Sequence, residues 1–161
     1  MKRGRRLLLV AHCVLNQNAV VHPLARAAGA LPGAVSAAME AGVGFYQLPC
    51  PETLFRGLTR APETLAGYDT AEYRRLCARL VRRVGRDLEP LLADGCAVAG
   101  VLGIAGSPSC SPTHPQGVWL RQLLAEPWLS GVPVLGVPEC EEEPDQDRTF
   151  QERLRAVLAK G

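Results

Sequence analysis

Short runs of aliphatic and β-branched residues recur along the chain, and each run stops at a proline, a glycine or a polar residue. Continuous apolar runs of this length are typical of strands that a sheet buries on both faces. The pattern therefore predicts four strands, the second of which ends in a proline-rich loop. These strands span residues 6–11, 43–51, 96–106 and 132–139.

Between these runs, apolar residues return at helical spacing. The clearest case lies between residues 76 and 88, where leucines and a valine recur on one face and arginines fill the other. This periodicity predicts an amphipathic helix that is capped by Asp69 or Thr70 and ends by Gly95. The remaining expected elements are one or two helices in 20–41, an extended loop over 52–68, a helix over 116–124, an acidic surface turn over 141–147 and a closing helix over 148–160.

Strands that alternate with helices favour a parallel sheet covered on both faces. We therefore expect an α/β fold, a Rossmann-like three-layer sandwich with a mostly parallel sheet of about four to five strands. The length of the chain indicates a single domain over residues 1–161. In such sheets ligands bind beyond the carboxyl ends of the strands, so chemistry is expected there.

Charge and hydropathy narrow the function classes. The net charge of +2 is too small to indicate a nucleic-acid partner, and the arginines between 74 and 86 are interpreted as a solvated face. No apolar run reaches the roughly 18 residues that a membrane helix needs. Residues 1–15 have a signal-like charge pattern, but His12 and Cys13 interrupt the short apolar part, and no small-residue cleavage site follows. We expect a cytoplasmic protein with no membrane partner.

The sequence contains 6 cysteines, which is many for a chain of this size. The chain is long enough, and rich enough in core-forming residues, to fold without disulfides, so metal ligation or redox chemistry in a reducing compartment is favoured. Cys77 falls on the apolar side of the long helix and Cys96 at the start of a strand, where a free cysteine acts as a small buried hydrophobe. The other cysteines each follow a predicted strand: Cys13, Cys50, Cys110 and Cys140.

Strand-end cysteines share one edge of a parallel sheet, so residues distant in sequence could converge there. Their spacing leaves three interpretations open: buried structural thiols, a catalytic zinc, or an iron–sulfur cluster. The sequence has no CxxC redox pair and no paired CxxC spacing of a zinc ribbon. Iron–sulfur clusters need soft, deprotonated sulfur ligands, and three ligands instead of four would leave one coordination position open.

Four local motifs occur in order: "HCVLNQN" (12–18), "PCPE" (49–52), "GYDT" (67–70) and "SPSC" (107–110). Together they resemble the thiouracil desulfidase family, the TudS-like proteins, and more closely a TudS-related branch of proposed desulfidases. The resemblance implies a [4Fe-4S] cluster held by Cys13, Cys50 and Cys110. It also implies a small thiolated substrate, such as 2-thiouracil, whose sulfur leaves as sulfide while water replaces it at carbon.

The resemblance further implies roles for individual residues. The family's proposed catalytic residues correspond to Glu52 and Ser107. Glu52 could activate water or shuttle a proton, and Ser107 could stabilise developing charge. The competing interpretations are a helix-start or surface carboxylate and a turn serine. Ser109 and Ser111 could donate hydrogen bonds to the cluster sulfides.

The sequence departs from the family at several positions. "VLNQNAVVHP" stands where the family has a Leu-Gly pair and an Arg-Tyr-Asp-Gly stretch, and Ser111 stands where it has glycine. These changes alter the expected pocket and leave the three cysteines in place. The amides of Asn16, Gln17 and Asn18 could read a pyrimidine edge or cap helices, and His114 is the histidine nearest in sequence to the third cysteine.

Three alternatives remain open at this point. Cys140 could close the fourth coordination position of a cluster, which would favour an electron carrier or a structural cluster. The same thiolates could serve a zinc hydrolase. The chain could also be a non-enzymatic sensor or carrier of iron–sulfur or persulfide sulfur, and a homodimer is possible in each case.

Overall fold

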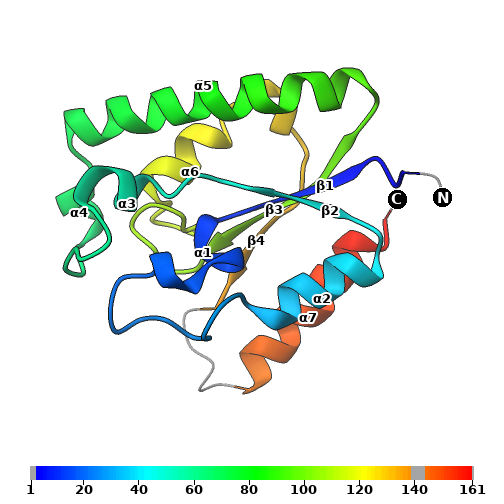
Figure 1. The fold of residues 1–161 in the computed structure, drawn as a ribbon, viewed down its shortest axis with the longest axis horizontal. Helices are drawn as coiled ribbons and strands as arrows, with labels where there is room; N and C mark the ends of the chain where they lie inside the picture. Colours follow the sequence, from blue (N-terminus) through cyan, green and yellow to red (C-terminus); the bar gives the residue numbers. More distant parts are fainter. Residues whose placement is uncertain (1–2, 139–143, 161) are drawn as a thin grey trace.

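A single sheet organises the computed structural model, which describes residues 3–138 and 144–160. Its strands are β1 (Arg6–Val10), β2 (Gly44–Gln47), β3 (Ala97–Ile104) and β4 (Val134–Val137). All of the pairings are parallel, in the order β2-β1-β3-β4. The predicted strands and the expected α/β fold with a parallel sheet are therefore confirmed (Figure 1).

Helices cover both faces of this sheet, as the alternating pattern predicts. Two helices, α5 (Ala71–Ala93) and α6 (Val118–Leu123), pack on one face, and α2 (Pro32–Glu40) and α7 (Pro144–Leu158) pack on the other (Figure 1). The arrangement is a Rossmann-like three-layer sandwich. The short helices are α1 (His12–Leu15), η1 (Gln17–Ala19), α3 (Pro51–Arg56), α4 (Leu65–Tyr68) and η2 (Pro127–Leu129).

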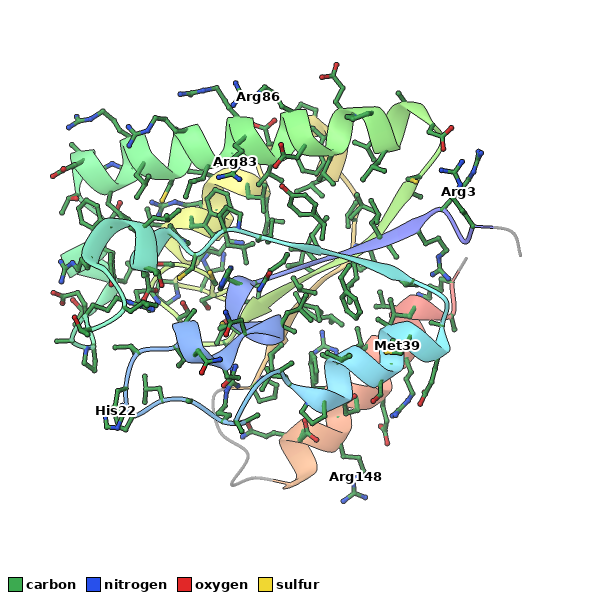
Figure 2. The ribbon with its side chains drawn as sticks, in the orientation of Figure 1. Arg3, His22, Met39, Arg83, Arg86 and Arg148 are labelled. Carbon is green, nitrogen blue, oxygen red and sulfur yellow. The ribbon has the colours of Figure 1, made fainter. Side chains whose placement is uncertain are left out.

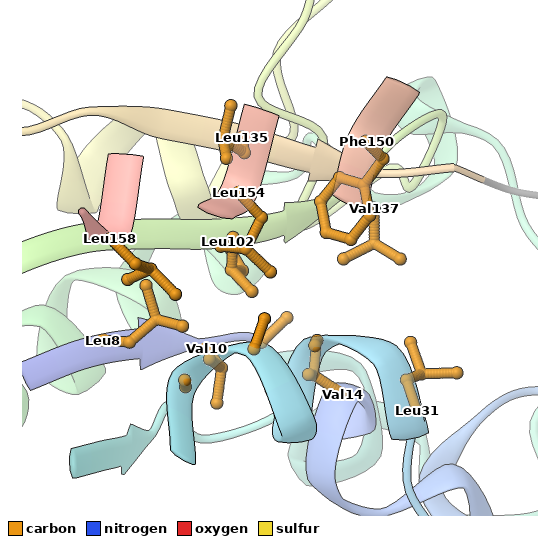
Figure 3. Close-up of a cluster of buried hydrophobic side chains, with 14 of the residues drawn as sticks. Leu8, Val10, Val14, Leu31, Leu102, Leu135, Val137, Phe150, Leu154 and Leu158 are labelled. Atoms are coloured by element: carbon orange, nitrogen blue, oxygen red, sulfur yellow. The ribbon is translucent and has the colours of Figure 1, made fainter. Parts of the chain in front are cut away.

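Successive residues of β1 enter opposite cores, which explains why all of its residues after Arg6 are apolar. Leu8 and Val10 belong to the cluster that also contains Leu154 and Leu158 of α7 (Figure 3). Leu9, between them, belongs to the cluster on the α5 side. Because Leu8, Leu9 and Val10 are fully buried against the helix layers, a polar residue at any of these positions would lack a partner.

The long helix begins and ends where the sequence predicts. The Thr70 hydroxyl accepts a hydrogen bond from the backbone N–H of Tyr73 at 3.2 Å, so Thr70 is the N-cap of α5. The chain leaves the helix at Gly95, whose φ of 81° lies in the left-handed region that glycine adopts without strain. Arg86 points outward from α5 in Figure 2, which fits the predicted solvated arginine face.

Several predicted boundaries are wrong. Residues 52–68 are not one extended loop, because Cys50 caps α3 and Thr64 caps α4. The one or two helices predicted within 20–41 are, by contrast, confirmed as one α-helix, α2, which starts at Pro32 after an irregular segment. The predicted acidic turn over 141–147 is helical from Pro144 onward, while Cys140 and the rest of that turn lie outside the described residues.

The described helices differ from a membrane-spanning helix in length or in apolar character. Within residues 3–138 and 144–160, none of them combines the length with the apolar character that a bilayer crossing requires.

Two glycines give opposite expectations for stability. A Cβ on Gly117 would lie 2.6 Å from the amide nitrogen of Cys110, whereas a Cβ on Gly85 would meet open space. We expect Gly117→Ala to lower the free energy of unfolding by about 1–3 kcal/mol, because the Cys110 loop must move. Gly85→Ala should raise it by about 0.5–1 kcal/mol, because alanine favours the helix. Chemical denaturation measures both, and a Gly117→Ala protein as stable as the parent would contradict the close packing.

Candidate functional site

Three cysteines leave the carboxyl edge of the sheet on neighbouring segments. Cys13 lies in α1 directly after β1, Cys50 caps α3 after β2, and Cys110 lies in the loop after β3. Each is electrostatically coupled to another, since Cys50 perturbs Cys13, and both perturb Cys110. The three thiols that the family resemblance implies are therefore close enough to act on one another's charge.

Burial makes the thiols of Cys13 and Cys110 hard to ionise. It raises the pKa of Cys13 to about 11, and the neighbouring Cys50 adds to this increase. Burial likewise raises the pKa of Cys110 well above its ordinary value, with Cys13 and Cys50 adding to the effect. Without a cation beside them, Cys13 and Cys110 stay protonated at neutral pH, because their thiolates would meet both desolvation and like-charge repulsion.

The donor set suits a soft, electron-poor centre. Within the described part of the chain, no three His, Cys, Asp or Glu side chains are grouped around the position of a single metal ion. The cysteines described there are free thiols. A [4Fe-4S] group spans more space than one ion and binds thiolates, so three neighbouring thiols from separate loops fit its ligands. Cys140, the predicted alternative fourth ligand, lies outside the residues that the structure describes.

The loop that carries Cys110 is held by Ser107. The Ser107 hydroxyl oxygen accepts hydrogen bonds from the backbone N–H groups of Ser109, at 3.3 Å, and Cys110, at 3.0 Å. The Cys110 carbonyl in turn accepts a bond from the Ile104 amide at 3.0 Å. Ser107 thus serves as a turn serine, and its own O–H hydrogen is still able to donate.

Two other serines of this loop bond to protein partners. Ser109 is fully buried, and its hydroxyl pairs with the hydroxyl of Tyr73 in α5. The Ser111 hydroxyl lies 3.2 Å from both the carbonyl and the hydroxyl of Thr113. These bonds orient both hydroxyls, and their predicted donation to cluster sulfides stays a prediction.

The amides that follow Cys13 stabilise its loop. Gln17 is buried, donates to the Cys13 carbonyl at 2.6 Å and accepts from the Arg26 amide at 2.8 Å. The Asn16 side chain caps η1 by accepting from Asn18. Of the two interpretations of these amides, capping and loop bracing is the one that the geometry fits.

The histidines stand apart from such networks. His22 and His114 are exposed, and His12 is partly exposed beside Cys13. Figure 2 shows His22 at the tip of its loop, away from the strand ends.

Glu52 sits in the first turn of α3 and is mostly buried. Its side chain is 13% exposed, and its Oε2 accepts a hydrogen bond at 3.2 Å from Nε of Arg60, which is 4% exposed. The negative charge of Glu52 contributes to the raised pKa values of Cys13 and Cys110. The carboxylate therefore belongs to the environment of the thiols, and a surface position is excluded.

A groove of about 300 Å³ opens beside Cys50. The groove is also lined by Tyr46, Arg83 and Asp87. The Tyr46 hydroxyl donates a hydrogen bond to Asp87 at 2.8 Å. This groove, with apolar and polar side chains next to a strand-end thiol, lies where small molecules approach a parallel sheet, beyond the carboxyl ends of its strands.

Sequence reasoning missed several contributors to this region. Thr53 donates to the Cys50 sulfur, Tyr73 bonds Ser109, and Arg60 pairs with Glu52. Thr53 follows the cap residue Cys50 by three positions, a spacing at which capping contacts occur. Its contact with Cys50 could therefore have been predicted from the local sequence. Arg60 had none, because its contacts depend on how separate loops pack.

The protein is thus an α/β protein with a parallel four-stranded sheet. Three cysteines follow the carboxyl ends of neighbouring strands of this sheet. The chain is 31% identical over 156 residues to the uncharacterized protein MJ0003 of Methanocaldococcus jannaschii, covering 97% of this chain and 99% of that protein. The chain belongs to the same family as MJ0003. No protein-family model and no solved structure matches it.

The stability of the metal-free protein should depend on Cys13. Folding raises the pKa of this thiol from 9.0 to about 11, so the native state holds the proton more tightly than the unfolded chain. This contribution is fully present below pH 9 and is lost as the pH rises through 11. We expect Cys13→Ala to flatten the decline of unfolding free energy over this range, measured by urea denaturation. Cys96→Ala, at the other sheet edge, is the control, and an equal slope in all three proteins would refute the assignment.

The buried ion pair should show strong coupling. Arg60→Leu leaves the Glu52 carboxylate without its partner and should lower the free energy of unfolding by about 3–5 kcal/mol. Arg60→Leu combined with Glu52→Leu should cost less than the sum of the single changes, because no uncompensated charge is left. A double-mutant cycle in denaturant measures the coupling, and additive single effects would contradict it.

Proposed function

We propose that the protein is a [4Fe-4S]-dependent desulfidase that removes sulfur from a small thiolated base as sulfide. One observation carries the proposal: three partly buried thiols from separate strand ends lie within electrostatic range of one another, and Glu52 acts on Cys13 and Cys110. The family resemblance of the motifs around them supports the same assignment. A thiouracil-like compound is the proposed substrate class, and the cytoplasm, where thiols stay reduced, is the proposed compartment.

In this proposal the cluster supplies a Lewis-acidic iron that is open to a soft sulfur atom. Cys13, Cys50 and Cys110 would hold the cluster, with the Cys50 side open to the groove through which a substrate would approach. The reaction balances as C=S plus water giving C=O plus hydrogen sulfide. Glu52 takes a proton from the attacking water at its carboxylate, and Ser107 donates its hydroxyl hydrogen toward developing negative charge.

The cofactor is tested by anaerobic reconstitution. We expect about four irons per chain and a broad absorption near ~400 nm. Cys110→Ser should lose most of this iron, while Cys96→Ser, at the opposite edge of the sheet, should keep it. A colourless protein with bound zinc would reject the cluster and favour a zinc hydrolase. Iron and acid-labile sulfide analysis measures the outcome.

The reaction is tested on the loaded protein with 2-thiouracil. We expect sulfide and uracil in equal amounts, and Glu52→Gln should lower the rate by roughly 10²–10⁴-fold with its iron content unchanged. Equal rates for Glu52→Gln and the parent would remove Glu52 from the mechanism. Absence of sulfide from a panel of thiolated bases would favour a sensor or carrier.

A further inference from the structure

Arg60 connects the segments that carry two of the three thiols. Its guanidinium is almost fully buried and donates to Glu52, to Thr53 Oγ1 at 3.1 Å, to the Gly57 carbonyl at 3.2 Å and to the Ala19 carbonyl at 3.0 Å. Ala19 lies in η1, which follows the Cys13 helix, while the other acceptors belong to α3 and its end. One side chain thus ties together the two loops that present Cys13 and Cys50.

Thr53 lies between this guanidinium and the Cys50 sulfur. Its Oγ1 is 3.2 Å from Cys50 Sγ, and its backbone nitrogen is 3.5 Å from the same sulfur. A guanidinium can only donate, so the Thr53 oxygen accepts from Arg60. A deprotonated cysteine can only accept, so the single hydroxyl hydrogen of Thr53 is directed to sulfur. The order of donation is therefore set from Arg60 to Thr53 to Cys50.

We propose that Arg60 and Thr53 are positioning residues that tune a cluster bound through Cys50, an inference that rests on the proposed function. Arg60 keeps the Thr53 hydroxyl oriented as a donor to the ligand sulfur, and it aims the Glu52 carboxylate with a second N–H. Hydrogen bonds to ligand sulfurs stabilise the more negative, reduced form of an iron–sulfur cluster and so raise its reduction potential. Neither residue needs to touch the substrate.

A purely structural role makes a different prediction. If Arg60 and Thr53 only brace the loops, their removal changes stability and leaves the potential of the cluster where it was. If they tune the sulfur, removing the hydroxyl alone shifts the potential, and restoring a hydroxyl restores it. Thr53 offers this comparison because valine keeps its shape and serine keeps its hydroxyl.

The experiment is an anaerobic redox titration of the reconstituted protein, with thermal unfolding as a parallel measurement. Thr53→Val should shift the midpoint potential to a more negative value at unchanged iron content, and Thr53→Ser should recover most of the shift. Arg60→Gln should shift it in the same direction. Arg56→Gln is the matched control, because the Arg56 guanidinium directs its hydrogen bonds to Glu63 and the Gly67 carbonyl instead of to Thr53.

The outcomes separate the two proposals. A parent protein that binds no iron overturns the proposed function, and this inference falls with it. A loaded parent whose potential equals that of Thr53→Val overturns the inference and leaves the proposed function intact. If Arg60→Gln does not fold, the Thr53 pair still decides, because it leaves the guanidinium in place.

Discussion

The parallel pairing of β1 with both of its neighbours is the constraint on which the rest of the site depends. Val10 is in register with Gln47 on one side and Leu102 on the other. The next residues continue the ladder, since the Ala11 amide donates to Leu102 and the Leu48 amide donates to Val10, each at 2.8 Å. Three chain segments therefore leave the sheet at the same level. Any thiol a few residues further along each segment is delivered to one small region.

Desolvation then decides what that region can do. The same burial that packs Cys13 and Cys110 against the core raises the cost of ionising them, and the Glu52 charge adds to it. Arg26 acts in the opposite direction on Cys13. Cys13 and Cys110 therefore favour the protonated form unless a positive centre offsets the cost of ionising them. On the proposed function, this environment disfavours a free nucleophilic thiolate and suits thiolates paired with a soft cationic centre.

The elements of the fold could be predicted because their signals are local. The strand at 6–11 is a continuous apolar run, and the cap at Thr70 precedes a clear helical period, so neighbouring residues carry the information. The short helix α3 was missed because its capping group is Cys50, outside the usual set of cap residues. The number of helices in 20–41 stayed open because an alanine-rich segment offers no period to separate helix from irregular chain.

The site was only partly predictable for a related reason. Cysteines at strand ends can be read from order and topology, but the contacts of Arg60 join residues up to 41 positions apart and leave no pattern in sequence. Gly117 is similar, because its need to be glycine follows from the Ser109–Cys110 peptide pressed against it.

The hydrogen bonds around the thiols also rank the candidate polar groups. The Ser107 oxygen already accepts from two amides, and the Ser109 hydroxyl is paired with Tyr73. Glu52 differs, because the Arg60 bond engages Oε2 alone, and within the described residues Oε1 has no hydrogen-bond partner. A carboxylate with one oxygen anchored and the other available can accept a proton without moving. On the proposed reaction, Glu52 is therefore the base, and Ser107 contributes as a donor only.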